Sequence, residues 1–275
     1  MTPNNNPTPN SEPIRAFSWN CNGLRAVMRR GDLQKFVAEY RPDILALQEI
    51  KLSQDQLREL KLPETFPDYQ MFWSFAERKG YAGTALWAKN GLTAKPISLE
   101  KHEIKDRYGD AYNEGRLTAV EINGALFVSM YAPNGKEDLS RIPLRVEWDK
   151  QMITLLKPYP KVLLMGDFNV ANEPIDVANP ATKKGKHGFT LEERDGFKNY
   201  LKAGYHDIWR EENPDKIQYT WWSFRVRNYD PEKPKPGWRI DYALVKGLAA
   251  KNAAIHDQIK GSDHCPISIN VEGQN

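Results

Sequence analysis

The feature that most restricts the possible folds of this chain is a set of short apolar stretches. Each is typical of a buried β-strand and ends in a carboxylate or an amide. Asp43–Gln48 is one such stretch and is followed by Glu49, and Lys161–Met165 leads into Asp167 and Asn169. Apolar runs of this length bounded by turn residues are typical of strands buried on both faces. Polar groups that follow such strands collect on loops held at the edge of a sheet. The pattern therefore favours an α/β fold in which these side chains converge.

Helical spacing and further strand-like runs fill the rest of the chain. Helices are expected over Asp32–Tyr40, Ser53–Leu60, Arg141–Leu156 and Thr190–Leu201. Asp32 is expected to cap the first of these helices, and a capping box of Thr190 with Glu193 begins the last. Further strands are expected at Ile14–Trp19, Tyr69–Phe75, Thr84–Ala88, Leu117–Ile122, Ala125–Tyr131, Tyr219–Phe224, Arg239–Val245, Ala253–Gln258 and Pro266–Val271. Asn123-Gly124 is a strong hairpin signal between two of them.

No linker, repeat or change of composition divides the 275 residues. We therefore expect one catalytic domain over residues 14–273, preceded by a disordered lead over residues 1–13. An α/β chain with so many strands favours two packed β-sheets flanked by helices. The net charge of +3 gives only weak support for a polyanionic partner, although a local basic patch is compatible with it.

The cysteine content and the lack of long apolar runs indicate a compartment. Cys21 and Cys265 are the only cysteines and lie near opposite ends of the chain, a pattern that favours a reducing compartment over a disulfide framework. No stretch approaches the roughly 20 apolar residues of a membrane span, and the N-terminus lacks the basic and apolar regions of a signal peptide. We expect a cytoplasmic protein without membrane contact.

The polar groups at the strand ends are of the kind that binds Mg²⁺ and cleaves phosphodiesters. Mg²⁺ takes oxygen ligands, which suits Glu49 as the principal ligand and Asn22 as a neutral supporter. Asp167 is placed to accept a proton from water. An imidazole such as that of His264 can donate to a phosphate oxygen, and Asp241 behind it would fix its tautomer and raise its pKa. Taken singly, each residue is more often a turn or cap residue, so the hypothesis depends on their joint occurrence.

Several longer motifs resemble the exonuclease III/abasic-site endonuclease family of the endonuclease/exonuclease/phosphatase superfamily. They are WNCNGLRA (19–26), LALQEIK (45–51), YAPNG (131–135), LLMGDFNVANEPIDVANP (163–180), GFTLEERDGF (188–197), YTWWSF (219–224), GWRIDYALV (237–245) and SDHCPI (262–267). They follow the family's order across nearly the whole chain. The resemblance implies a four-layer α/β sandwich with its site at one edge of two mixed sheets. It also implies hydrolysis of DNA 5′ to an abasic site, with added 3′→5′ exonuclease and 3′-phosphodiesterase activity.

The resemblance also assigns expected roles, cofactor and partner. The catalytic residues it implies are Tyr131, Asp167, Asn169, Asp241 and His264. The metal site it implies comprises Asn22, Glu49, Asp167, Asn169, Asp263 and His264, with Mg²⁺ as the ion and Mn²⁺ as a substitute. The DNA-binding residues it implies are Asn20, Asn134, Lys136, Trp221, Arg225, Trp238 and Ile240. The partner is double-stranded DNA with abasic sites or blocked 3′ ends, bound by a monomer.

The aromatic and basic residues around these motifs have a second interpretation. Trp221, Trp238 and Ile240 match the apolar walls for a flipped-out abasic sugar, whereas Trp222 and Phe224 are expected to be core residues. The cluster Lys183, Lys184 and Lys186 either touches phosphates or is solvated surface.

Two alternative functions stay open. A superfamily phosphodiesterase acting on RNA or small phosphoesters would keep Asp167, Asn169 and His264, but is not expected to carry TWWSF and WRIDY together. A non-catalytic nucleic-acid-binding relative would have lost catalytic groups. Here every catalytic position holds a chemically competent residue, which argues against that second alternative.

Overall fold

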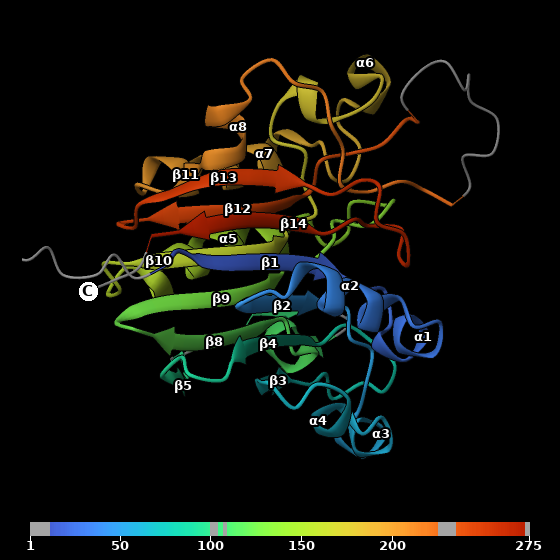
Figure 1. Cartoon of the computed structure of the whole chain (residues 1–275). Helices are drawn as coiled ribbons and strands as arrows, with labels where there is room; N and C mark the ends of the chain where they lie inside the picture. The colour runs from blue at the N-terminus through green and yellow to red at the C-terminus, as the bar shows by residue number, and fades with distance from the viewer. Residues whose placement is uncertain (1–11, 100–103, 107–108, 225–234, 273–275) are drawn as a thin grey trace, which may run out of the picture.

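The computed structural model describes residues 12–99, 104–106, 109–224 and 235–272, and its centre is a pair of packed six-stranded sheets (Figure 1). The first sheet has the order β13 (Ala250–Ile255), β14 (Ile267–Val271), β1 (Ile14–Asn20), β2 (Ile44–Gln48), β4 (Thr84–Lys89) and β3 (Tyr69–Ser74). The second has the order β11 (His206–Asp207), β12 (Asp241–Lys246), β10 (Val162–Asp167), β9 (Ala125–Tyr131), β8 (Leu117–Ile122) and β5 (Ala94–Pro96). A separate small hairpin pairs β6 (Lys105–Asp106) with β7 (Gly109–Asp110).

Helices cover the outer face of each sheet. The first sheet carries α1 (Leu24–Arg29), α2 (Asp32–Tyr40), α3 (Gln54–Glu59) and α4 (Leu62–Thr65), and the second carries α5 (Ile142–Leu156) and α7 (Leu191–Lys202). Shorter elements are η1 (Ala111–Glu114), η2 (Pro174–Asp176), α6 (Pro180–Lys183) and α8 (Ile208–Glu212). Phe36 of α2 packs on Trp19 of β1, and Phe197 of α7 packs on Tyr242 of β12. The expected four layers, helix–sheet–sheet–helix, are confirmed.

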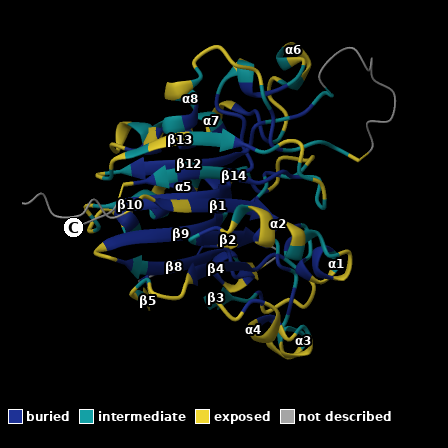
Figure 2. Cartoon of the chain, viewed as in Figure 1, coloured by how far each residue is buried: buried dark blue, intermediate teal, exposed yellow. Residues whose placement is uncertain are grey.

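The space between the two sheets is apolar over most of its length and polar at one end. Alternate residues of each strand face inward, and Ala16, Ala46, Phe127 and Leu163 belong to this inner core. The strands are almost entirely buried, as Figure 2 shows for β1, β2 and β9. Two residues farther along the same inward face, polar side chains replace apolar ones: Ser18 in β1, Gln48 in β2 and Ser129 in β9. These side chains lie next to the candidate site.

Strand direction brings the polar ends together. Strand β1 runs parallel to β2, and β9 runs parallel to β10, so all four end at the same edge. Strand β12 is antiparallel to β10 and begins at that edge, where Asp241 pairs with Asp167. The side chains that follow or begin these strands are therefore neighbours, although they come from distant parts of the sequence.

Two sequence predictions about elements are wrong in detail. The expected strand Tyr219–Phe224 is irregular and makes only isolated bridges, from Trp221 to Trp238 and to His264. It fails to form a ladder because it meets single residues of two different segments. The helix α2 is preceded by Gly31 at φ 75°, and Asp32 lies inside the helix and does not cap it. The short helix α1 was not predicted.

Two expectations drawn from the composition concern membrane-spanning helices and the two cysteines. Within the part of the chain that the structure describes, no helix combines the length and apolar character required to cross a bilayer. Cys21 and Cys265 are both buried and both free thiols. Burial raises the pKa of the Cys21 thiol to about 12, so this thiol stays protonated and is a poor nucleophile.

Candidate active site

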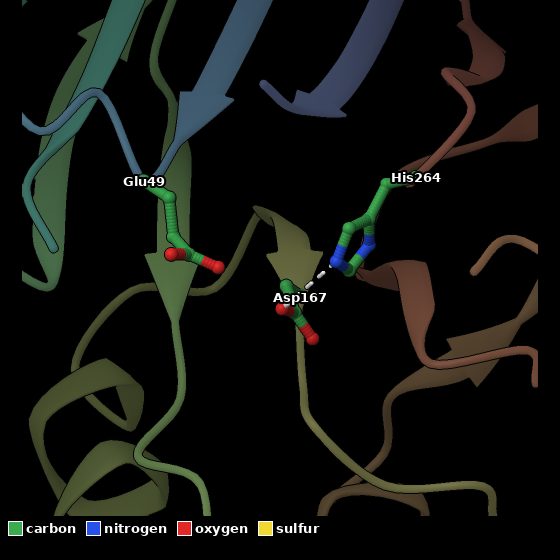
Figure 3. A group of neighbouring side chains, drawn as sticks. All are labelled: Glu49, Asp167 and His264. Atoms are coloured by element: carbon green, nitrogen blue, oxygen red, sulfur yellow. Dashed lines mark ion pairs between the residues drawn. The ribbon is translucent and has the colours of Figure 1, made fainter. Parts of the chain in front are cut away.

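Three potential ligand groups meet at the shared sheet edge. Glu49 follows β2, Asp167 ends β10 and His264 lies just before β14, and Figure 3 shows the three side chains pointing toward one another. One ligand atom from each lies within 4.8 Å of the others. The first sheet supplies Glu49 and the second supplies Asp167, so the cluster spans the junction of the two sheets.

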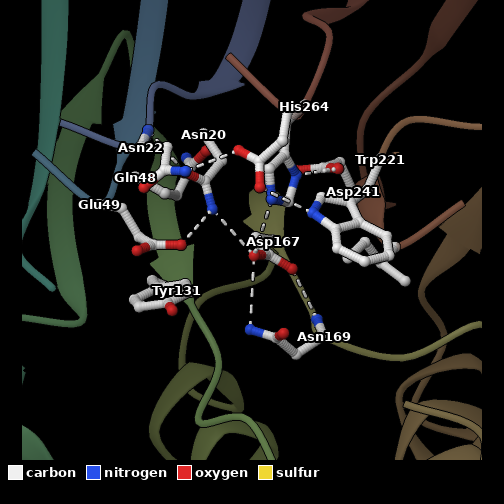
Figure 4. Close-up of polar contacts among 12 residues, drawn as sticks. Asn20, Asn22, Gln48, Glu49, Tyr131, Asp167, Asn169, Trp221, Asp241 and His264 are labelled. Carbon is white, nitrogen blue, oxygen red and sulfur yellow. Dashed lines mark hydrogen bonds and ion pairs between the residues drawn. The ribbon is translucent and has the colours of Figure 1, made fainter. Parts of the chain in front are cut away.

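Asn20 joins the two carboxylates. Its Nδ2 donates to Glu49 Oε1 and to Asp167 Oδ2, both at 3.0 Å, as Figure 4 shows. Its Oδ1 accepts from the backbone N–H of Asn22 at 3.0 Å. The side chain is fully buried, whereas the sequence prediction made Asn20 a DNA contact.

Glu49 is ionised and already pairs with a cation. Lys51 Nζ lies 2.9 Å from Glu49 Oε2 and also donates to Asn22 Oδ1. Burial opposes ionisation of Glu49, but the charge of Lys51 and the hydrogen bond from Asn20 outweigh it and lower the pKa of Glu49. The carboxylate is thus available as an anionic ligand at neutral pH.

Asp167 is the more basic carboxylate. It is buried, and burial raises its pKa to about 7, with Asp241 and Glu49 also raising it and His264 opposing them. The backbone N–H of Asn169 donates to Asp167 Oδ1 at 2.8 Å. A carboxylate with a pKa near neutrality is suited to accept a proton.

The side chain of Asn169 is itself fixed from two directions. Its Nδ2 donates to the carbonyl oxygen of Ala132 at 3.0 Å, and its Oδ1 accepts from Asn134 Nδ2 at 3.0 Å. The backbone N–H of Lys136 in turn donates to Asn134 Oδ1 at 2.7 Å. Asn134 and Lys136, both predicted to contact DNA, thereby connect to the Asp167 side of the cluster.

His264 is held by a carboxylate on each side. Its Nδ1 lies 2.8 Å from Asp241 Oδ2, and its Nε2 lies 3.8 Å from Asp167 Oδ2. Burial disfavours the charged imidazolium, but the charge and hydrogen bond of Asp241 dominate, followed by Asp167 and Asp263. They raise the pKa of His264 to about 10. The pKa increase expected from an Asp241 partner is therefore present.

Two further predicted residues border the cluster. Asp263 accepts from Asn22 Nδ2 at 2.9 Å on one oxygen and from Trp221 Nε1 at 3.0 Å on the other. Tyr131 ends β9, and burial followed by the charge of Glu49 raises its pKa well above the ordinary value. Its phenol therefore remains a neutral hydrogen-bond donor.

Comparison with known protein families shows to which family this chain belongs. A model described as the endonuclease/exonuclease/phosphatase family matches residues 17–264, a range that includes the whole cluster. The chain belongs to this family.

Individual relatives of the family narrow the comparison. The chain is 35% identical to the exodeoxyribonuclease of Bacillus subtilis, over 93% of this chain and 98% of the relative. It is 33% identical to the DNA-(apurinic or apyrimidinic site) endonuclease of Dictyostelium discoideum, over 94% and 71%. The crystal structure of an AP endonuclease from Leishmania major superposes with a TM-score of 0.81 at 25% identity, covering 95% of this chain and 88% of that one. The resemblance to the exonuclease III/abasic-site endonuclease family is confirmed.

The predicted apolar wall is assembled beside this family site. Trp221 and Trp238 pair through their backbones, and the Trp221 ring centroid lies 6.5 Å from that of His264. Ile240 is buried, whereas both tryptophans are half-buried. Lys183 Nζ lies 5.8 Å from the Trp238 ring centroid. One lysine of the basic cluster therefore contacts the wall.

The remaining aromatic and DNA-contact predictions differ in outcome. Trp222 packs against the small core of Trp209, Ile255 and Ile267, as expected of a core residue. Phe224 is 69% exposed, so the expectation that it is a core residue is wrong. Arg225 lies outside the described residues.

Sequence reasoning missed three groups at the site. Arg116 lies over the Tyr131 ring, with its guanidinium carbon 4.6 Å from the centroid, and Lys51 contacts Glu49. Lys51 had a usable signal, since it lies two residues after Glu49 in the LQEIK motif. Arg25 and Arg29 line a cleft that also includes Lys51. Arg25 had a similar signal, since it lies three residues after Asn22 in the motif WNCNGLRA, whereas Arg29 had none because α1 was not predicted.

Proposed function

We propose that this protein is a Mg²⁺-dependent DNA-repair nuclease that hydrolyses the phosphodiester 5′ to an abasic site in duplex DNA. We propose that it also has 3′→5′ exonuclease and 3′-phosphodiesterase activity. The observation that carries the proposal is the Asn20 bridge, which holds an ionised Glu49 and a basic Asp167 side by side next to a cationic His264. A phosphodiesterase needs this combination: an anionic metal ligand, a proton acceptor for water and a cationic contact for phosphate.

The donor set fits a magnesium ion. Glu49 and Asp167 offer carboxylate oxygens within 4.8 Å of each other, and the amides of Asn22 and Asn169 border them. Oxygen donors of this kind are the preferred Mg²⁺ ligands. We propose Glu49 as the principal ligand, with the Lys51 ammonium giving up its contact when the metal binds. The metal would stabilise negative charge on the phosphoryl oxygens.

The pKa values favour phosphate over metal as the partner of His264. With a pKa of about 10, His264 is protonated at neutral pH. An imidazolium has no free lone pair for a metal and donates hydrogen bonds from both nitrogens. We therefore propose that Nε2 donates to a phosphate oxygen while Asp241 holds Nδ1. The neutral phenol of Tyr131 is placed to make a second such contact.

The proton acceptor in this scheme is Asp167. Its pKa of about 7 and its fixed orientation through the Asn169 N–H support a role as general base toward the attacking water. We propose that Asn20 is a positioning residue that keeps Asp167 and Glu49 at a constant separation. Its complete burial supports this role better than direct DNA contact.

Two clefts that carry basic side chains support duplex DNA as the partner. Arg25 and Arg29 line one cleft, and Lys216, Lys235 and Lys260 line a second that also includes His264. Lysine and arginine contacts to phosphates provide most of the affinity for a DNA backbone. We propose that the apolar wall of Trp221, Trp238 and Ile240 receives the extruded abasic sugar, which is small and inexpensive to unstack.

The molecular context follows from the same assignment. We propose that residues 14–273 form one catalytic domain, since a single inner core joins both sheets. We further propose a monomer in the cytoplasm, where a reducing environment suits two buried free thiols.

The deciding experiment uses a duplex with one synthetic abasic site, labelled at the 5′ end. Purified protein is incubated with Mg²⁺, with Mn²⁺, or with EDTA, and the products are resolved by gel electrophoresis. We expect incision 5′ to the abasic site with either metal and none with EDTA. Asp167→Ala and His264→Ala variants should lose this turnover, and Asp167→Ala should keep duplex affinity.

Two outcomes would contradict the proposal. Equal internal incision of an undamaged duplex, or equal cleavage of a matched RNA duplex or a small phosphodiester, would favour a broader phosphodiesterase. Absence of cleavage by the wild-type protein, together with tight duplex binding that the Asp167→Ala variant retains, would favour a non-catalytic binding protein.

A further inference from the structure

A row of side-chain hydrogen bonds crosses between the two sheets behind the site. The link nearest the cluster is the Asn20–Asp167 contact at 3.0 Å between β1 and β10. The next joins Gln48 of β2 to Ser129 of β9, with Nε2 donating to Oγ at 3.0 Å. The outermost is a hydroxyl–hydroxyl contact at 2.9 Å between β4 and β8, made by Thr84 and Thr118.

The three links occupy neighbouring strands, in register except that Asp167 pairs with Tyr131, two residues beyond Ser129. In the first sheet Asn20 pairs with Gln48, and Gln48 pairs with Thr84. In the second sheet Ser129 pairs with Thr118. The row therefore runs across three adjacent strands of each sheet, and its first member is the bridge that touches Glu49 and Asp167.

Gln48 is the centre of this row, and both polar atoms of its amide have a hydrogen-bond partner. It is fully buried, its Oε1 accepts from Ser18 Oγ at 3.2 Å, and its Nε2 donates to Ser129. Ser129 Oγ also donates to the backbone carbonyl of Leu47 at 3.1 Å. Four polar groups thus join β1, β2 and β9 where the rest of the inner face is packed with apolar side chains.

A polar row between the sheets restricts how the two sheets can be arranged. Apolar packing tolerates small relative shifts of two sheets, whereas a satisfied buried hydrogen-bond network specifies one arrangement. Gln48 directly precedes Glu49, and Ser129 lies two residues before Tyr131 on the same face of β9. A shift of β2 against β9 would therefore move Glu49 away from the groups that the second sheet provides.

We propose that Gln48 and Ser129 are positioning residues that hold the Glu49 carboxylate at the separation from Asp167 that a divalent metal requires. This inference rests on the proposed function of Glu49 as the metal ligand. Side chains that orient a metal ligand commonly change metal affinity about 10- to 100-fold when they are replaced. Thr84 and Thr118 make the same type of link farther from Glu49 and provide the matched control.

The test compares Gln48→Met, Ser129→Ala, their double variant and Thr84→Val. Methionine is unbranched like glutamine and fills a similar volume. Mn²⁺ affinity is measured on the DNA-free protein by electron paramagnetic resonance of the free ion, and the thermal midpoint of each variant is recorded beside it.

We expect Gln48→Met and Ser129→Ala each to raise the Kd for Mn²⁺ about 10-fold or more. The double variant should resemble the singles, because both remove one link. Thr84→Val should lower the thermal midpoint and leave the Kd unchanged.

Two results would overturn the inference. One is an unchanged Kd in Ser129→Ala and Gln48→Met, and the other is an equal rise in Kd in Thr84→Val, which would reduce the row to a general contribution to stability. The measurement contains no DNA, so its outcome is separable from the proposed function. Loss of abasic-site cleavage by the wild-type protein contradicts the function alone, whereas normal cleavage with an unchanged Kd in both variants contradicts this inference alone.

Discussion

At the scale of single residues, the site depends on backbone conformations that most side chains avoid. Glu49 has φ 48° directly after β2, and Asn169 has φ 50° two residues after β10, both in the left-handed region. Asparagine tolerates this region, but glutamate does so rarely, and such strained residues cluster at functional sites. The strain turns each side chain out of the line of its strand and into the cluster.

Replacement of the proposed base tests the role of a single carboxylate. Asp167→Asn keeps the size and most hydrogen bonds of the side chain but removes its ability to accept a proton. We expect kcat on abasic duplex to fall about 10²- to 10⁴-fold, the usual contribution of a general base, with duplex affinity retained. Asp195→Asn, which removes an exposed carboxylate from α7, is the control and should have wild-type kcat. Equal kcat in Asp167→Asn and wild type would exclude Asp167 as the base.

The pairing of His264 with Asp241 predicts a change in pH dependence. The pKa of His264 is raised to about 10, and Asp241 is the main group that raises it. Asp241→Asn removes that charge, so the pKa falls and the imidazolium is lost at a lower pH. We expect the alkaline limb of the kcat profile to move down by about 1 to 3 pH units. An unmoved limb would show that protonated His264 is not required. Asp257→Asn, which removes an exposed carboxylate before β14, is the control.

At the scale of elements, a buried ionic network fixes the segment that carries the apolar wall. Arg239 is buried between two carboxylates, with Nε 2.7 Å from Asp176 Oδ1 and Nη2 2.8 Å from Asp207 Oδ2. Asp176 also accepts from Arg210 at 2.5 Å. The network connects η2 and α8 to Arg239, which lies between Trp238 and Ile240. It therefore fixes the position of these two apolar side chains relative to β12.

Removal of one partner from this network should be strongly destabilising. Asp176→Ala leaves Arg239 with a single carboxylate in a buried place, and breaking a buried pair in this way costs about 3–5 kcal/mol. We expect that loss in the free energy of unfolding, measured by guanidinium denaturation. Glu272→Ala breaks the exposed contact with Lys251 and should cost no more than about 1 kcal/mol. Similar small losses in both variants would mean that the buried network contributes little.

At the scale of the whole molecule, the two sheets share one edge, and charged and apolar side chains both gather there. The family site lies at that edge. One cleft there includes Lys51, Arg25 and Arg29, and a second includes His264 and three lysines. The backbones of Trp221 and Trp238 pair beside His264. The net charge is only +3. Binding of a polyanion therefore depends on where the basic side chains lie.

This distribution predicts how duplex affinity responds to salt. The logarithm of the binding constant should fall linearly with the logarithm of salt concentration. Arg29→Ala should weaken binding to all sequences alike and reduce the slope by about one, because Arg29 is exposed in the cleft. Lys251→Ala removes an exposed cation from the edge strand β13 and should leave the slope unchanged. A flat salt response in the wild-type protein would contradict the proposed phosphate contacts.

The sequence by itself determined the elements and the chemistry of this protein. Local apolar periodicity and turn residues are properties of neighbouring residues, so the hairpin Leu117–Tyr131, the capping box of α7 and the strand ends that carry Glu49 and Asp167 followed from it. The motifs that surround those residues also indicated the family.

Only the tertiary structure decided how these residues work together. Asn20 and Asp167 are 147 positions apart, and no local pattern predicts that an amide from one sheet will bridge carboxylates from both. The same holds for the irregular Trp221 segment, the exposure of Phe224 and the Gln48–Ser129 link. These features depend on burial and on the register between sheets, which arise only when distant segments pack against each other.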